Sequence, residues 1–292
     1  MRRLQDSWTN LPNWEYKFYD DEASRAFISS NFPPPFLEAF DALKIGAYKA
    51  DFFRYCVLAI EGGVYVDMDV MLQSDLNLLV QPHLTLFVPV DEPGKQVSRQ
   101  PCLWNGFLGA TPSHPVILKA LEQSVNGILN RRTIEDIESA LLCPSILELT
   151  SITRHYDTIF LTGPCNLGVA ANTVMGSSGP LETFAPGLRE FEVDGFVHTA
   201  LLLQTEKYYL GGALRIIDPT DEAIIAATNL KDMNDDPAFP TNDRKKAKEG
   251  SGHYSLTEGK GEKVWGASGV YVDDEVNEGD PEECHIVIQI GE

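Results

Sequence analysis

Two aspartates one residue apart, Asp67 and Asp69, are the residues of this 292-residue chain best suited to chemistry. They follow a short apolar run, Val64-Tyr-Val66. Because residues i and i+2 of an extended chain share a face and lie roughly 7 Å apart, we expect both carboxylates to point the same way. The alternative is that the two acidic residues end the strand in a solvated turn, where aspartates are common. Carboxylate oxygens suit Mg²⁺ or Mn²⁺, which proteins usually hold through one or two carboxylates plus substrate phosphates. The pair therefore predicts a site for a metal-bound diphosphate.

A second polar pair, Asp51 and Arg54, precedes the aspartates. Residues three apart on a helix are neighbours on its surface. One interpretation is an exposed ion pair that contributes little; the other is a buried pair that binds a polar ligand. Because the helix looks mostly buried and leads directly to the two aspartates, we favour the second.

The elements that must position these residues are a helix, a glycine turn and a strand. Apolar spacing predicts a helix over residues 44–60, and Gly62 and Gly63 end it because glycine readily takes the left-handed conformation. We also expect a strand over 14–19, a helix from Asp20 and another over 115–129. Strands alternating with helices predict an α/β fold in one domain, residues 1–292. We expect residues 232–252 to form a mobile loop, and beyond about residue 180 the pattern weakens.

Composition excludes several classes of protein. The net charge of −20 disfavours nucleic acid and anionic membrane surfaces as partners. No apolar run is long enough to span a membrane, and residues 1–8 lack a signal-peptide core. The five scattered cysteines contain no C-x-x-C motif, so a zinc site is not expected. Their odd number fits a mostly reduced set, with one or two disulfides left open.

Taken together, these residues resemble the DXD-containing glycosyltransferases of the initiation-specific α-1,6-mannosyltransferase type. The resemblance covers residues 8–120 well and fades beyond. It is carried by three runs: Trp14-Glu-Tyr-Lys-Phe-Tyr-Asp-Asp21; Ala50-Asp51-x-x-Arg54 with Leu58, Gly62-Gly63-x-Tyr65-x-Asp67-x-Asp69; and Asn105-Gly-Phe-Leu-Gly-Ala-Thr-Pro-Ser-His-Pro115.

The resemblance implies a GT-A-like α/β/α sandwich and a metal-dependent, retaining hexosyltransferase. Such an enzyme moves a hexose, with mannose favoured, from a nucleotide-diphosphate sugar such as GDP-mannose or a UDP-hexose to a glycan or glycolipid acceptor. Asp69 would ligate Mn²⁺ or Mg²⁺ directly. Asp67 would bind the metal through water, or hold the donor's ribose or sugar. Retention implies no obligatory general base.

The resemblance also assigns residues around the metal. Asp51, Arg54 and Asn105 would contact the donor sugar. His253 is a candidate further metal ligand, although its spacing from Trp265 departs from the family pattern and a loop histidine is an equal alternative. His114 is expected to be structural.

One departure concerns the start of the sheet. A strand similar to I-P-K-x-I-H-Q-I-W precedes this region in the family, whereas this chain begins at Met1-Arg-Arg-Leu. We therefore expect a sheet that lacks the family's first strand. The resemblance implies a Golgi lumen or membrane location, with no signal or anchor in this chain.

Two alternatives remain open. The run Val66-Asp-Met-Asp-Val70 also matches the haloacid-dehalogenase phosphatase motif, in which Asp67 is the nucleophile and Asp69 the acid/base. That motif needs a long apolar strand, whereas the glycines leave only three residues before Asp67, and it gives Asp51 and Arg54 no role. The other alternative is a non-catalytic, truncated relative of the transferases.

Overall fold

The computed structural model describes residues 2–9, 11–43, 46–91, 102–130, 161–176, 184–207, 214–228 and 285–290. The helices in these ranges are α1 (Arg2–Thr9), α2 (Asp21–Asn31), α3 (Pro34–Ala42), α4 (Gly46–Ile60), α5 (Leu76–Leu79), α6 (Pro115–Leu129) and α9 (Pro164–Val174). The strands are β1 (Trp14–Tyr19), β2 (Gly63–Val66), β3 (Val70–Leu72), β4 (Leu86–Asp91), β5 (Cys102–Leu103), β6 (Phe107–Ala110), β7 (Gly187–Val193), β8 (Phe196–Lys207), β9 (Leu214–Ile217), β10 (Ile224–Thr228) and β11 (His285–Ile290).

The strands form a mixed sheet in the order β1-β11-β2-β6-β4-β8-β9-β10-β3, with β5 beside β4 and β7 beside β8. Strand β4 runs parallel to β8, and the other pairings in the described residues are antiparallel. Strand β2, which leads to the two aspartates, pairs with β6 from Gly63 opposite Ala110 to Val66 opposite Phe107. The prediction of an α/β fold is confirmed at the level of a mixed sheet with helices.

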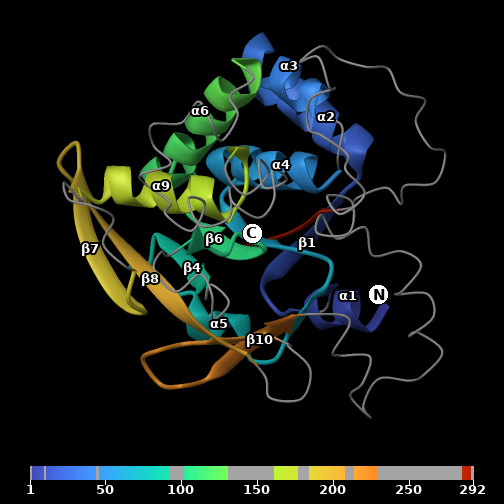
Figure 1. Ribbon diagram of the computed structural model, residues 1–292. Coiled ribbons are helices and arrows are strands. Elements are labelled where there is room, and N and C mark those ends of the chain that lie inside the picture. Colours follow the sequence, from blue (N-terminus) through green and yellow to red (C-terminus); the bar gives the residue numbers. More distant parts are fainter. Residues whose placement is uncertain are drawn as a thin grey trace, which may run out of the picture.

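Helices cover both faces of this sheet (Figure 1). Side chains of β2 alternate between the two layers: Tyr65 packs in the core under α2, α3, α4, α6 and α9, whereas Val64 and Val66 pack in the core with α1 and α5. This alternation follows from the two-residue period of a strand, and burial on both faces explains why β2 is apolar throughout. The site therefore begins where a fully buried strand ends.

Helix α4 and the turn after it confirm the predicted helix and its glycine end. Eleven of the helix's fifteen residues are buried. Gly62 has φ +67°, and a Cβ on it would lie 2.6 Å from the Cδ atom of Pro112. Glycine is needed here for its backbone conformation and for its close approach to the turn before α6. The register between α4 and β2 is thereby fixed.

Strand β11 lies between the edge strand β1 and β2 and pairs with both. Its sequence, His-Ile-Val-Ile-Gln-Ile, suits a strand with neighbours on each side. Strand β11 thus supplies backbone hydrogen-bond partners to the facing edges of β1 and β2. The predicted loop over 232–252 and His253 lie outside the described residues. No helix in the described residues has both the length and the apolar character needed to cross a membrane.

Candidate active site

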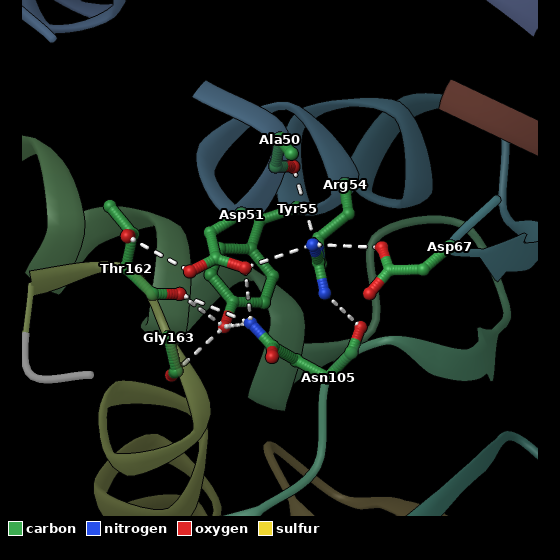
Figure 2. Close-up of polar contacts among 8 residues, drawn as sticks. All are labelled: Ala50, Asp51, Arg54, Tyr55, Asp67, Asn105, Thr162 and Gly163. Carbon is green, nitrogen blue, oxygen red and sulfur yellow. Dashed lines mark hydrogen bonds and ion pairs between the residues drawn. The ribbon is translucent and has the colours of Figure 1, made fainter. Parts of the chain in front are cut away.

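Asp51 lies at the centre of a buried polar network that joins three parts of the chain (Figure 2). Its Oδ1 atom accepts a hydrogen bond from Asn105 Nδ2 at 3.0 Å and pairs with Arg54 Nη2 at 2.9 Å. Its Oδ2 atom accepts from Thr162 Oγ1 at 3.2 Å. The predicted pairing of Asp51 with Arg54 forms, and it is buried rather than exposed.

Arg54 links this network to the first aspartate of the motif. Its Nη2 atom lies 3.1 Å from Asp67 Oδ1, its Nη1 atom donates to the backbone carbonyl of Asn105, and its Nε atom donates to the carbonyl of Ala50. The guanidinium carbon lies 4.6 Å from the centre of the Tyr65 ring, close enough for a cation–π contact. The Arg54 side chain is 3% exposed and that of Asp67 is 33% exposed. Asp67 is therefore the solvent-facing end of a buried chain of charges.

The two aspartates occupy a turn, so the expectation of one shared strand face is wrong. Strand β2 ends at Val66, the Asp67 carbonyl accepts the backbone N–H of Val70 at 3.0 Å, and β3 then begins. The chain turns here because β3 pairs with β10 in a distant part of the sheet. The backbone N–H of Asp67 donates to the carbonyl of Gly106 at 2.8 Å, which anchors the turn beside β6.

Asp69, on the far side of this turn, is electrostatically coupled to Asp67. Loss of water around its carboxyl and the charge of Asp67 raise the pKa of Asp69 to about 6, and a hydrogen bond with Thr228 opposes the increase. Two neighbouring carboxylates repel each other when both are ionised, so the ionisation of one opposes that of the other. A divalent cation bound between them would offset this repulsion, so the pair is suited to hold one. Their oxygen atoms fit Mn²⁺ or Mg²⁺.

The described residues contain no cluster of three or more His, Cys, Asp or Glu side chains arranged to hold a metal ion. Metals of this class often take only one or two protein carboxylates and complete their shell with waters and substrate phosphates. The two aspartates thus fit a metal whose remaining ligands come from a bound diphosphate. Any contribution of His253 lies outside the described residues.

The charged groups of the buried network shift one another's pKa values. Burial raises the pKa of Asp51 to about 6, and the Asp67 charge adds to this, whereas Arg54 and the hydrogen bonds from Thr162 and Asn105 oppose it. Burial alone would lower the pKa of Arg54, but Asp67, Tyr65, Asp51 and Tyr55 raise it above its usual value. Arg54 is therefore a permanent buried cation held between two carboxylates.

Sequence reasoning missed two members of this network, Tyr55 and Thr162. The Tyr55 hydroxyl donates to the Thr162 carbonyl at 2.7 Å and accepts from Asn105 Nδ2 at 3.2 Å. Its position four residues after Asp51, on the same helix face, was an available signal. Thr162 lies 111 residues from Asp51, and nothing in its local sequence indicates that contact. His114 is structural, as predicted: its Nδ1 atom accepts from the backbone N–H of Val116 and caps α6.

Comparisons with known proteins find similarity to glycosyltransferases. Residues 1–85 match the family described as a glycosyltransferase sugar-binding region containing a DXD motif. The chain is 37% identical over 164 residues to an uncharacterized glycosyltransferase of Acanthamoeba polyphaga mimivirus, an alignment covering 53% of this chain and 62% of that protein. It is 35% identical over 116 residues to inositol phosphoceramide mannosyltransferase 2 of Schizosaccharomyces pombe, covering 39% of this chain and 31% of the relative.

A third relative is the initiation-specific alpha-1,6-mannosyltransferase of Schizosaccharomyces pombe, 29% identical over 127 residues, with 37% of this chain and 31% of the relative covered. The chain thus spans less than two thirds of the length of each of these relatives. Asp51, Arg54, Asp67 and Asp69 all lie within the 85 residues that match the family. Residues 1–85 are therefore similar to the sugar-binding region of the DXD-motif glycosyltransferases, as the sequence resemblance predicted.

Proposed function

We propose that this protein is a metal-dependent, retaining glycosyltransferase that moves a hexose from a nucleotide-diphosphate sugar to a glycan or glycolipid acceptor. The observation that carries the proposal is the bridge made by Arg54, which holds Asp51 at 2.9 Å and Asp67 at 3.1 Å. This bridge joins the helix face assigned to the sugar with the turn assigned to the metal and diphosphate. The matched family and the names of the relatives support the same reaction class.

Mannose is the favoured sugar, with GDP-mannose as the first donor to test and UDP-hexoses as the alternatives. The support is that two relatives are named as mannosyltransferases. One of those names specifies inositol phosphoceramide, a glycolipid type of acceptor, and the other an initiating α-1,6 linkage. Both a glycolipid and a glycan therefore remain acceptors to assay.

Each site residue has a proposed role. Asp69 ligates the metal, with His253 as a further candidate ligand, and Asp67 binds the metal through water or holds the donor's ribose or sugar. Asp51, Arg54 and Asn105 are assigned to the sugar hydroxyls, for which fixed and bidentate partners are suited. Because all three are buried and bonded to one another, the sugar would meet them at the edge of this network, where Asp67 faces solvent. When bound, Mn²⁺ or Mg²⁺ offsets the negative charge that grows on the departing diphosphate. A GT-A-like fold would hold these groups.

A Golgi lumen location follows from the same resemblance. Cys165 is disulfide-bonded, whereas the buried Cys56 is free. Disulfides persist in oxidising compartments, so the bond at Cys165 supports a site of action within the secretory pathway.

Substitution of Asp69 tests the proposed reaction. We expect Asp69→Asn to lower Mn²⁺-dependent hydrolysis of the accepted nucleotide sugar by about 100-fold or more, because the metal supplies several kcal/mol of charge stabilisation. The measurement is nucleoside diphosphate release across GDP-mannose, UDP-glucose and UDP-galactose. Asp41→Asn is the matched control, since Asp41 forms an exposed ion pair with Arg25. Full activity of Asp69→Asn would refute the metal role.

The same assay separates the two alternatives. A burst of aspartyl-phosphate without sugar release would identify the phosphatase, and Mn²⁺ binding without turnover of any donor would identify a non-catalytic relative. Retention is tested by transfer to methyl mannoside, with the anomeric configuration of the product measured by NMR. A retaining enzyme converts the axial sugar–phosphate bond of the donor into an axial glycosidic bond in the product. The relatives reported above are glycosyltransferases by name and give the phosphatase no support.

A further inference from the structure

Gly106 faces the carboxylate of Asp67 from the turn before β6. Its carbonyl accepts the backbone N–H of Asp67 at 2.8 Å, so the two residues lie side by side. A Cβ built on Gly106 would overlap Asp67 Oδ2 and would lie 2.6 Å from the Cζ2 atom of Trp104. No side chain larger than hydrogen fits here while Asp67 keeps its position.

Backbone conformation does not explain this glycine. Gly106 has no left-handed φ, unlike Gly62 and Gly63 in the turn after α4. An alanine could therefore adopt the same backbone. Glycine is needed at this position for steric reasons, because Asp67 Oδ2 occupies the space that a Cβ would fill.

The two oxygens of Asp67 thus have different neighbours. Oδ1 lies 3.1 Å from Arg54 Nη2, whereas Oδ2 occupies the space that a Cβ on Gly106 would need. We infer that Gly106 is a positioning residue, which together with Arg54 fixes the Asp67 carboxylate in the orientation that receives the metal and its diphosphate. This inference rests on the proposed function, because it assigns Gly106 a task in that site.

The first experiment tests the contact itself and needs no ligand. In a double-mutant cycle of the full chain, Gly106→Ala should lower the thermal midpoint of the otherwise unaltered protein. It should lower it much less in an Asp67→Ala background, where the clashing oxygen is gone. Equal shifts in both backgrounds would overturn the inference. If Gly106→Ala alone fails to fold, folding of the double variant supports the contact and failure of the double variant contradicts it.

Trp104 provides the second branch of the cycle, because its ring also meets the added Cβ. Trp104→Leu removes the Cζ2 and Cε2 atoms while keeping an apolar side chain. The Gly106→Ala effect should persist in that background if Asp67 is the important neighbour. Its disappearance there would assign Gly106 to packing against Trp104 and would overturn the positioning role.

The second experiment measures Mn²⁺ affinity in the presence of GDP by electron paramagnetic resonance. Gly106→Ala should weaken Mn²⁺ binding about 10- to 100-fold, the usual effect of disturbing a group that orients a metal ligand. Gly127→Ala is the matched control, since its Cβ would meet only the flexible end of Leu161. Equal affinity in Gly106→Ala and the unaltered protein overturns this inference alone. Absence of Mn²⁺ binding to the unaltered protein instead counts against the proposed function.

Discussion

At the scale of single residues, Arg54 has the most demanding role in the site. It is a buried cation that contacts two carboxylates and two backbone carbonyls, and its planar fork makes this geometry accessible to arginine but not to lysine. Removing it would leave Asp51 buried without its counter-ion. The ion pairs of Arg54 therefore matter through the penalty of breaking them more than through any net stabilisation.

We predict that Arg54→Met destabilises the protein by about 3–5 kcal/mol, the usual result of removing one partner from a buried pair. The free energy of unfolding in urea measures this directly. Arg25→Met is the control, because Arg25 is 55% exposed and its pair with Asp41 faces solvent. If both substitutions had the same small effect, the network in Figure 2 would not exist as a buried unit.

At the scale of elements, the local parts of the site followed from sequence. Helix α4, its glycine end and strand β2 could be predicted because apolar spacing and left-handed glycines act over a few residues. The turn at Asp67 was an alternative, because aspartates are common in turns, but it was not the favoured expectation, since it depends on the pairing of β3 with β10, about 150 residues later. The contact of Thr162 with Asp51 has the same origin in tertiary structure.

The hairpin of β7 and β8 was missed for a different reason, since its signal is local. Asp194 and Gly195 both have positive φ, at 52° and 82°, and join Val193 to Phe196. An Asp-Gly pair between β-rich segments is a strong hairpin signal. In β7, Gly-Leu-Arg-Glu-Phe-Glu-Val, the alternation is broken at its start, because Leu188 is exposed and Arg189 shares the strand face of Phe191.

Helix α6 carries a pH-dependent cap. Burial, with a smaller contribution from His198, lowers the pKa of His114 from 6.5 to about 3. Between these values the unfolded chain binds a proton that the folded protein does not. His114 therefore favours the folded state above pH 6.5, and this contribution is lost as the pH falls toward 3, with a slope of at most about 1.4 kcal/mol per pH unit.

We predict that His114→Asn removes this slope. Asparagine retains an oxygen that can cap the helix but does not titrate in this range. Unfolding free energies of both proteins at pH 7.5, 6, 5 and 4 should show the advantage of the unaltered protein shrinking as the pH falls. A constant difference across these pH values would mean that His114 is protonated equally in the folded and unfolded states.

At the scale of the whole molecule, β11 joins the edge strand β1 to β2, the strand that leads into the site. It lies between β1 and β2, although some 220 residues separate it in sequence from the strand that ends at the aspartates. Through β2 it supports the turn that carries Asp67, and through Val287 it packs in the core beneath α4. Sequence could not predict this placement, because an apolar strand does not specify which distant strands it will join.

We therefore predict that Val287→Asp disrupts both stability and the site. Val287 is fully buried, and an ionised carboxylate without a partner costs several kcal/mol there. The same substitution at Val197, which is 67% exposed on β8, is the matched control and should leave the thermal midpoint nearly unchanged. In Val287→Asp, both the thermal midpoint and the rate of Mn²⁺-dependent donor hydrolysis should fall. In Val197→Asp, neither quantity should fall. A stable, active Val287→Asp protein would show that β11 is dispensable, and that β2 positions Asp67 without a partner on that edge.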